Sequence, residues 1–184
     1  GTRFLRGEPD LWQVLDSLFR ARGKPMDVLL EDLAIERWRY DQRSAAPQLA
    51  VDGPYRLSDL PVHTEPSDPP IHPGGSAYVL VDTQSRSKGT YLRVWTRGEF
   101  GVRWGLTALR LNADGKAIGR VNNPGREGRP ERYLVVELSD DTEAVLLITT
   151  NLGDRLPDAD IATVHARSTR FILDLGPGSD DEPK

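Results

Sequence analysis

The chain has 184 residues and no cysteine, which excludes disulfides, thiol nucleophiles and thiolate metal sites. Its 24 Lys and Arg residues stand against 28 Asp and Glu residues, and the formal net charge of −4 argues against a dedicated nucleic-acid-binding protein. No apolar run approaches the ~20 residues of a membrane-spanning helix. With 17 glycines added to 38% hydrophobic residues, the composition is that of an ordinary globular chain, and the length predicts one domain with an appendage.

The first part of the chain has the periodicity of amphipathic helices. One helix is expected over about 9–22, with Gly23 as the left-handed residue after its last turn, and a second helix is expected to start at Pro25. The apolar positions that repeat at helical spacing are Leu11, Leu15, Leu18, Phe19, Met26, Leu29, Leu30 and Leu33. We therefore predict a helical hairpin over 1–43, which must pack on the rest of the chain or on another domain.

The next segment, 44–75, is rich in proline. It holds seven of the chain's 14 prolines, which exclude a helix or a central strand. It also holds apolar residues that a free linker would lack, namely Leu49, Val51, Tyr55, Leu57, Leu60 and Val62. We predict an extended connector that lies over a surface and is anchored by these side chains.

From residue 76 onward the hydrophobic period is two. Short runs rich in β-branched and aromatic residues alternate with turn residues at 78–81, 91–96, 100–111, 133–138, 144–150 and 170–175. This pattern predicts an antiparallel, jelly-roll-like β-sandwich over 76–176, followed by a disordered tail over 177–184. The expected fold class is α+β.

The most specific local prediction is a hairpin around Gly98. A three-residue loop, Thr96-Arg97-Gly98, with Gly98 in the left-handed conformation, would place Val94 opposite Phe100 and Leu92 opposite Val102. This register gathers the apolar side chains on one face of the hairpin.

The opposite face of that hairpin is the expected binding site. It would carry Tyr91, Arg93, Trp95, Glu99 and Arg103, of which Tyr91, Arg93, Trp95 and Arg103 are the candidate binding residues. An exposed Trp flanked by arginines suits a sugar ring or a partner protein. The alternative is that Arg93 or Arg103 covers the indole by a cation–π contact and the face is only solvated.

Two groups of residues have the chemistry of metal ligands. Asn151, Asp154, Asp158 and Asp160 follow a predicted strand closely enough to form a calcium site, although Asx turns and strand-end hydrogen bonds explain them equally. His63 and His72 bracket Glu65 and Asp68, but the spacing is not that of a zinc motif. No cofactor other than calcium is expected. The sequence has no nucleophile elbow, phosphate-binding glycine loop or His-Glu-x-x-His motif, so we predict no catalytic residue and favour a non-enzymatic role.

The order of these features resembles a known arrangement. Residues 4–6 and the helical run 11–40, with its Leu-Leu-Glu-Asp-Leu-Ala at 29–34, resemble the last helices of secreted bacterial zinc-metallopeptidase-like proteins. The stretches 136–138, 145–154 and 171–174 resemble the β-sandwich domains of the pre-peptidase or proprotein-convertase type that follow such peptidases. The resemblance carries over no catalytic residue, because the zinc-binding helix motif is absent.

The resemblance implies a non-catalytic accessory module of a secreted bacterial protein, periplasmic or extracellular, whose partner is an upstream domain of the same precursor or a separate protein. A carbohydrate-binding or adhesive module that acts through Trp95 is the second hypothesis. A small enzyme with an unrecognised site is the third. None of these hypotheses involves nucleic acid or a membrane span.

Overall fold

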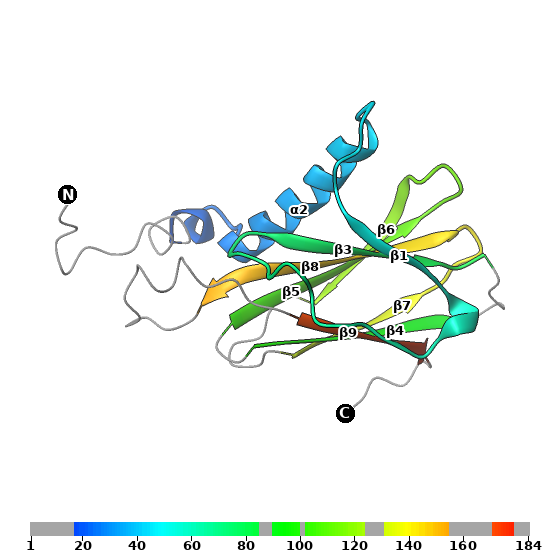
Figure 1. Ribbon diagram of the computed structural model, residues 1–184. Helices are drawn as coiled ribbons and strands as arrows, with labels where there is room; N and C mark the ends of the chain where they lie inside the picture. Colours follow the sequence, from blue (N-terminus) through cyan, green and yellow to red (C-terminus); the bar gives the residue numbers. More distant parts are fainter. Residues whose placement is uncertain (1–16, 85–89, 100–101, 124–130, 155–170, 179–184) are drawn as a thin grey trace.

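The computed structural model describes residues 17–84, 90–99, 102–123, 131–154 and 171–178, which form a helix over a two-layered β-sandwich (Figure 1). The α+β class and the sandwich are as predicted. No described helix is long and apolar enough to cross a membrane. The elements in chain order are α2 (Met26–Gln42), β1 (Val51–Arg56), η1 (Leu57–Asp59), β2 (Val62–His63), β3 (Ser76–Asp82), β4 (Tyr91–Gly98), β5 (Val102–Leu111), β6 (Ala117–Asn123), β7 (Glu131–Glu137), β8 (Ala144–Asp154) and β9 (Phe171–Gly178).

The strands form two sheets. The five-stranded sheet has the order β1-β3-β8-β5-β6, and the four-stranded sheet has the order β2-β9-β4-β7. Every described pairing within the predicted sandwich is antiparallel, as expected. The connector adds β2 as an antiparallel edge strand and β1 as a parallel one. The inner faces of the two sheets enclose the main core, which includes Val81, Leu92, Val94, Trp104, Leu106, Val136, Val145 and Leu147.

Helix α2 covers the outer face of the five-stranded sheet. Ala34, Ile35 and Trp38 pack against sheet residues such as Leu109 and Ile148, which forms a second, smaller core. The helix begins one residue after Pro25, where the sequence predicts it, and Gly23 has the expected left-handed conformation, with φ +78°. Residues 17–21 are also helical, while the rest of the first predicted helix lies outside the described residues.

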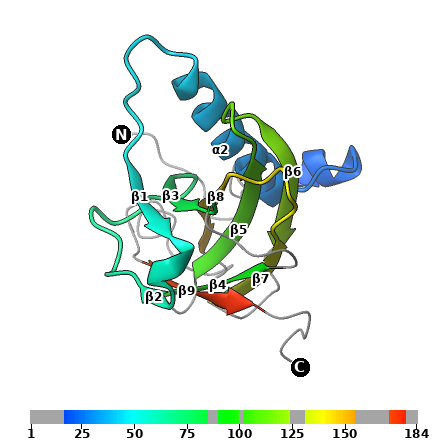
Figure 2. The same cartoon turned by 90° about the vertical axis from the view of Figure 1, so that its right-hand side faces the viewer.

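The proline-rich segment is extended and anchored, as predicted. Its β1 is an edge strand of the five-stranded sheet and its β2 is an edge strand of the four-stranded sheet, so the segment passes down one side of the sandwich from one layer to the other (Figure 2). The anchor side chains nearer to β2 pack on the main core, whereas Leu49 and Val51 pack on the core beneath α2. Edge positions suit this segment because proline cannot donate a ladder hydrogen bond.

The predicted hairpin around Gly98 is wrong. Strand β4 pairs with β7 and β9, and β5 pairs with β6 and β8, so the chain changes sheets between them. Val94 lies opposite Leu134 and Leu175 instead of Phe100, which is outside the described residues. Gly98 does not have a positive φ. A glycine is needed there because a Cβ atom would overlap the buried indole of Trp104.

Strand β9 ends at Gly178, so it extends two residues into the expected disordered tail. The remaining tail residues, 179–184, lie outside the described residues.

Candidate binding surface on the four-stranded sheet

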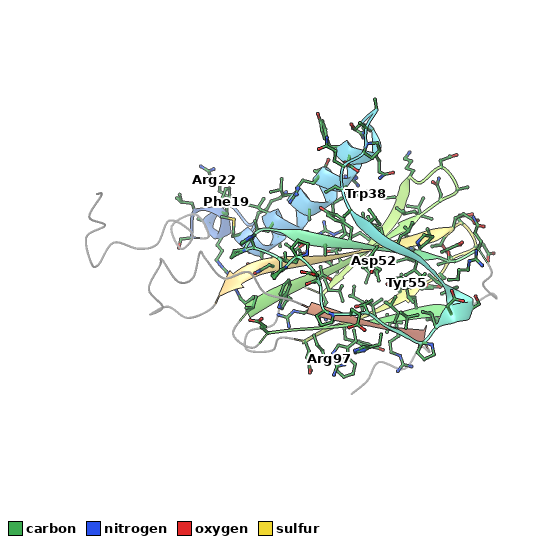
Figure 3. All side chains as sticks on the ribbon, viewed as in Figure 1. Phe19, Arg22, Trp38, Asp52, Tyr55 and Arg97 are labelled. Carbon is green, nitrogen blue, oxygen red and sulfur yellow. The ribbon has the colours of Figure 1, made fainter. Side chains whose placement is uncertain are left out.

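The side chains of β4 alternate between the core and the outer face of the four-stranded sheet. Leu92, Val94 and Thr96 are fully buried, whereas Arg93, Trp95 and Arg97 are exposed. Arg97 points away from the sandwich (Figure 3). The exposed fraction of Trp95 is 41%, which is high for an indole. The outward position of Trp95 is therefore as predicted, although the hairpin from which we derived it does not form.

The indole of Trp95 is held by side chains from two positions. Tyr133 lies directly opposite on β7, and its ring stands at 87° to the indole with a centroid separation of 6.5 Å. The guanidinium carbon of Arg97 lies 5.9 Å from the centroid of the indole, at the outer limit of a cation–π contact. The alternative for this face was a cation–π contact from Arg93 or Arg103. The structure places Arg97 over the indole, and 41% of Trp95 is still exposed.

We name this face the Trp95 surface and define it by the outward residues of β4 and the adjacent positions of β7: Tyr91, Arg93, Trp95, Arg97, Tyr133 and Val135. Acidic residues stand at both ends of the surface. Glu131 is opposite Arg97, and Glu137 is opposite Tyr91. The surface therefore combines an aromatic centre with charges of both signs.

The backbone beneath the Trp95 surface is rigid. Strand β4 is hydrogen-bonded to a neighbour on both sides along its whole length, and its inward side chains are fully buried in the main core. A side chain on such a strand keeps its position with less conformational freedom than one on a loop. The surface is thus ordered before any ligand arrives.

Arg103 does not belong to this surface, which corrects the prediction. It lies on β5 in the other sheet and faces α2, where its Nη1 donates to both carboxylate oxygens of Asp27 at 2.8 and 3.0 Å. Its Nη2 donates to the carbonyl oxygen of Leu152 at 2.9 Å. Arg103 therefore fastens the start of the helix to the five-stranded sheet. The error follows from the change of sheet after Gly98.

The expected calcium ligands are only partly within the described structure. Asn151 is buried, its Nδ2 donates to the carbonyl oxygen of Ile71 at 2.8 Å, and its Oδ1 accepts from the N–H of Gly153 at 2.9 Å. The side chain of Asp154 and the whole of Asp158 and Asp160 lie outside the described residues. Within the described ranges, no three His, Asp or Glu side chains, including His63 and its neighbours, come together as a metal site.

Comparisons with known proteins add little to this geometry. No protein-family model matches the chain, and no curated protein matches it. Among solved structures, it is similar to the enzymatically active domain of tailspike protein 4 of bacteriophage CBA120, with 12% identity and a TM-score of 0.38. The match covers 64% of this chain and 18% of the tailspike chain.

Proposed function

We propose that the chain is a non-catalytic interaction module of a secreted protein and that it binds a protein partner through the Trp95 surface. The observation that carries this proposal is the half-exposed indole at the centre of a rigid strand, held between Tyr133 and Arg97. Trp, Tyr and Arg are the residues most enriched among those that dominate binding energy in protein interfaces.

The size of the exposed indole is sufficient for an anchor. An exposed fraction of 41% corresponds to roughly 100 Å² of a Trp side chain. Burial of that area would contribute about 2–3 kcal/mol at ~25 cal/mol per Å². The ring is already held by its neighbours, so its ordering upon binding costs less than that of a freely rotating side chain.

The resemblance of the sequence to accessory sandwiches of secreted peptidase-like proteins supports an upstream domain of the same precursor, or a separate secreted protein, as the partner. The mixed charges at the ends of the surface suit the polar rim that surrounds the buried centre of such an interface.

A carbohydrate is the second candidate ligand, because an exposed indole can stack on a sugar ring and the neighbouring arginines can donate hydrogen bonds to hydroxyl groups. Arg97 lies over the indole, however, and would compete with a sugar for that position. This contact is the reason why we favour a protein partner.

The test compares Trp95→Ala with a matched control, Ile118→Ala. Ile118 lies on β6 in the other sheet, and its exposed fraction is 40%, compared with 41% for Trp95. Wild type and both variants are immobilised and exposed to the secreted proteins of the native host and, separately, to a panel of polysaccharides. We expect one protein that wild type and Ile118→Ala retain and that Trp95→Ala loses.

Retention of a polysaccharide that depends on Trp95 would instead establish the carbohydrate candidate. If Trp95→Ala retained everything that wild type retains, the Trp95 surface would not be the binding site.

A further inference from the structure

A buried acid lies between α2 and the five-stranded sheet. Glu31 is on the inward face of the helix, and its side chain is only 2% exposed. Its Oε1 has no hydrogen-bond partner among the described residues. Buried carboxylates are normally paired or hydrogen-bonded, so this arrangement calls for a physical explanation.

The sheet makes room for Glu31 rather than binding it tightly. Gly105 of β5 lies directly beneath the carboxyl group, and a Cβ atom at that position would be 2.5 Å from Oε1. The contacts of the other oxygen, Oε2, are long: 3.4 Å to Nδ2 of Asn122 and 3.5 Å to Nη2 of Arg120. Arg120 makes its shorter ion pair with Asp32, at 2.6 Å.

The other charged groups near Glu31 do not supply a dedicated counter-charge. Asp27 and Asp32, on the same helix, both disfavour a second negative charge. The cations that face them from the sheet are Arg103, which pairs with Asp27, and Arg120, which is shared. Desolvation by burial is the largest cause that raises the pKa of Glu31, and together these effects bring it from 4.5 to about 7.

A neutral acid fits this place better than a carboxylate does. The protonated carboxyl group can donate a hydrogen bond, which a carboxylate cannot. Thr107 lies two residues beyond Gly105 and thus on the same face of β5, and its buried Oγ1 also lacks a partner within the described part of the chain. The interface between α2 and the sheet therefore offers the carboxyl group no hydrogen bond at Oε1 that would stabilise its negative charge.

We propose that Glu31 is a proton-controlled latch, which holds the first half of α2 on the five-stranded sheet when it is neutral and loosens that half when it is ionised. The second half of the helix has its own attachment to the sheet, because Ala34, Ile35 and Trp38 pack in an apolar core. Release of the first half would uncover the outer face of β5 around Gly105, on the side of the molecule opposite to the Trp95 surface.

The direction of the pH dependence follows from linkage. In the released helix Glu31 meets water and returns to its ordinary pKa of 4.5, whereas in the docked helix the pKa is about 7. The docked state therefore binds more protons between these two values, and docking weakens as the pH rises. The docking equilibrium should fall by up to about tenfold per pH unit, roughly 300-fold in total, and should change little above pH 8.

The experiment is hydrogen exchange, measured by mass spectrometry on the whole chain at pH 5.5 and pH 8.0 and corrected for the intrinsic exchange rate. Protection of residues 26–33 should fall at least tenfold at the higher pH, while that of 145–149 in β8 stays constant. In Glu31→Gln, a neutral isostere, protection of 26–33 should not depend on pH. Glu36→Gln, which changes an exposed acid on the same helix, should behave like wild type.

A second variant acts on the space beneath the latch. In Gly105→Ala the new methyl group would displace the carboxyl group, so protection of 26–33 should be low at both pH values. Equal protection of wild type at the two pH values would overturn the proposal, and so would a Glu31→Gln variant with the pH dependence of wild type. If Glu31→Gln does not fold, the wild-type and Gly105→Ala measurements decide the question.

Discussion

Substitution of Gly98 by alanine tests the packing of the two sheets. An alanine Cβ would lie 2.5 Å from Cδ1 and 2.6 Å from Cε2 of Trp104, well inside van der Waals contact. The indole is fully buried and rigid, so either β4 or Trp104 must move. Overpacking of a core costs ~1–3 kcal/mol, and overlap with several ring atoms places Gly98→Ala near 3 kcal/mol. At about 2–4 °C per kcal/mol for a chain of this size, the melting temperature should fall by about 6–12 °C.

Gly176→Ala is the matched control, because Gly176 lies on the neighbouring strand β9 and its Cβ would meet nothing within 4 Å. Urea denaturation of Gly98→Ala, Trp104→Leu and the double variant gives a double-mutant cycle. The double variant should lose less stability than the sum of the two single variants, because the smaller residue makes room for the new methyl group. A melting temperature of Gly98→Ala within 2 °C of wild type would refute this packing of Trp104 on β4.

Four further substitutions test other contacts. As the pH rises from 5 to 8, wild type should lose up to about 3 kcal/mol of stability, because Glu31 has a raised pKa and ionises over this range. Glu31→Gln should lose less, and thermal melts across the range measure the difference. Tyr78→Phe removes the 3.0 Å hydrogen bond from the buried phenol to the carbonyl oxygen of Ala34, and urea denaturation should show a loss of about 1 kcal/mol. Asp41→Ala leaves two N–H groups of the connector without their acceptor and should cost about 1–3 kcal/mol in the same assay. Trp95→Ala should change stability by less than about 1 kcal/mol, far below the ~3–5 kcal/mol of a core Trp.

Periodicity predicts the strands better than it predicts their partners. The alternation of β4 correctly separates its buried residues from Arg93 and Trp95, because the period of two is a property of one strand alone. The same alternation cannot distinguish a hairpin from a chain that changes sheets, since both place Leu92 and Val94 inward. The sequence correctly indicates that Gly98 has a structural role. The reason for the glycine is its close contact with Trp104, which depends on tertiary structure and cannot be read from the strand pattern.

Short or irregular strands escape the pattern. The pattern does not predict β6, because its sequence combines a glycine with polar residues, and its place at the edge of the sheet requires few apolar side chains. The strands β1 and β2 lie in a segment whose prolines indicate a connector, and only the apolar anchors showed that it packs on the sandwich. The jelly-roll-like strand order stays a prediction.

The candidate site was half predictable. The outward positions of Arg93 and Trp95 follow from the alternation of the strand itself. Tyr133 reaches the surface through the pairing of β7 with β4, two strands that are distant in the sequence. Arg97 contacts the indole from a position that the wrong hairpin assigned to a turn. Arg103 was misplaced for the same reason. Glu31 was hidden among the polar positions of α2, because burial of a single acid leaves no periodic signal in the sequence.

The most direct measurement for the proposed interface is photo-crosslinking in the native host, with benzoylphenylalanine in place of Arg93 or, as control, in place of Ile118. Both positions are exposed, and they lie on opposite sheets of the sandwich. If the Trp95 surface is the interface, we expect one crosslinked protein from position 93 that is absent from position 118 and disappears when Trp95→Ala is added to the position 93 variant. The same crosslinked protein from both positions, or a crosslink at position 93 that Trp95→Ala leaves intact, would contradict it.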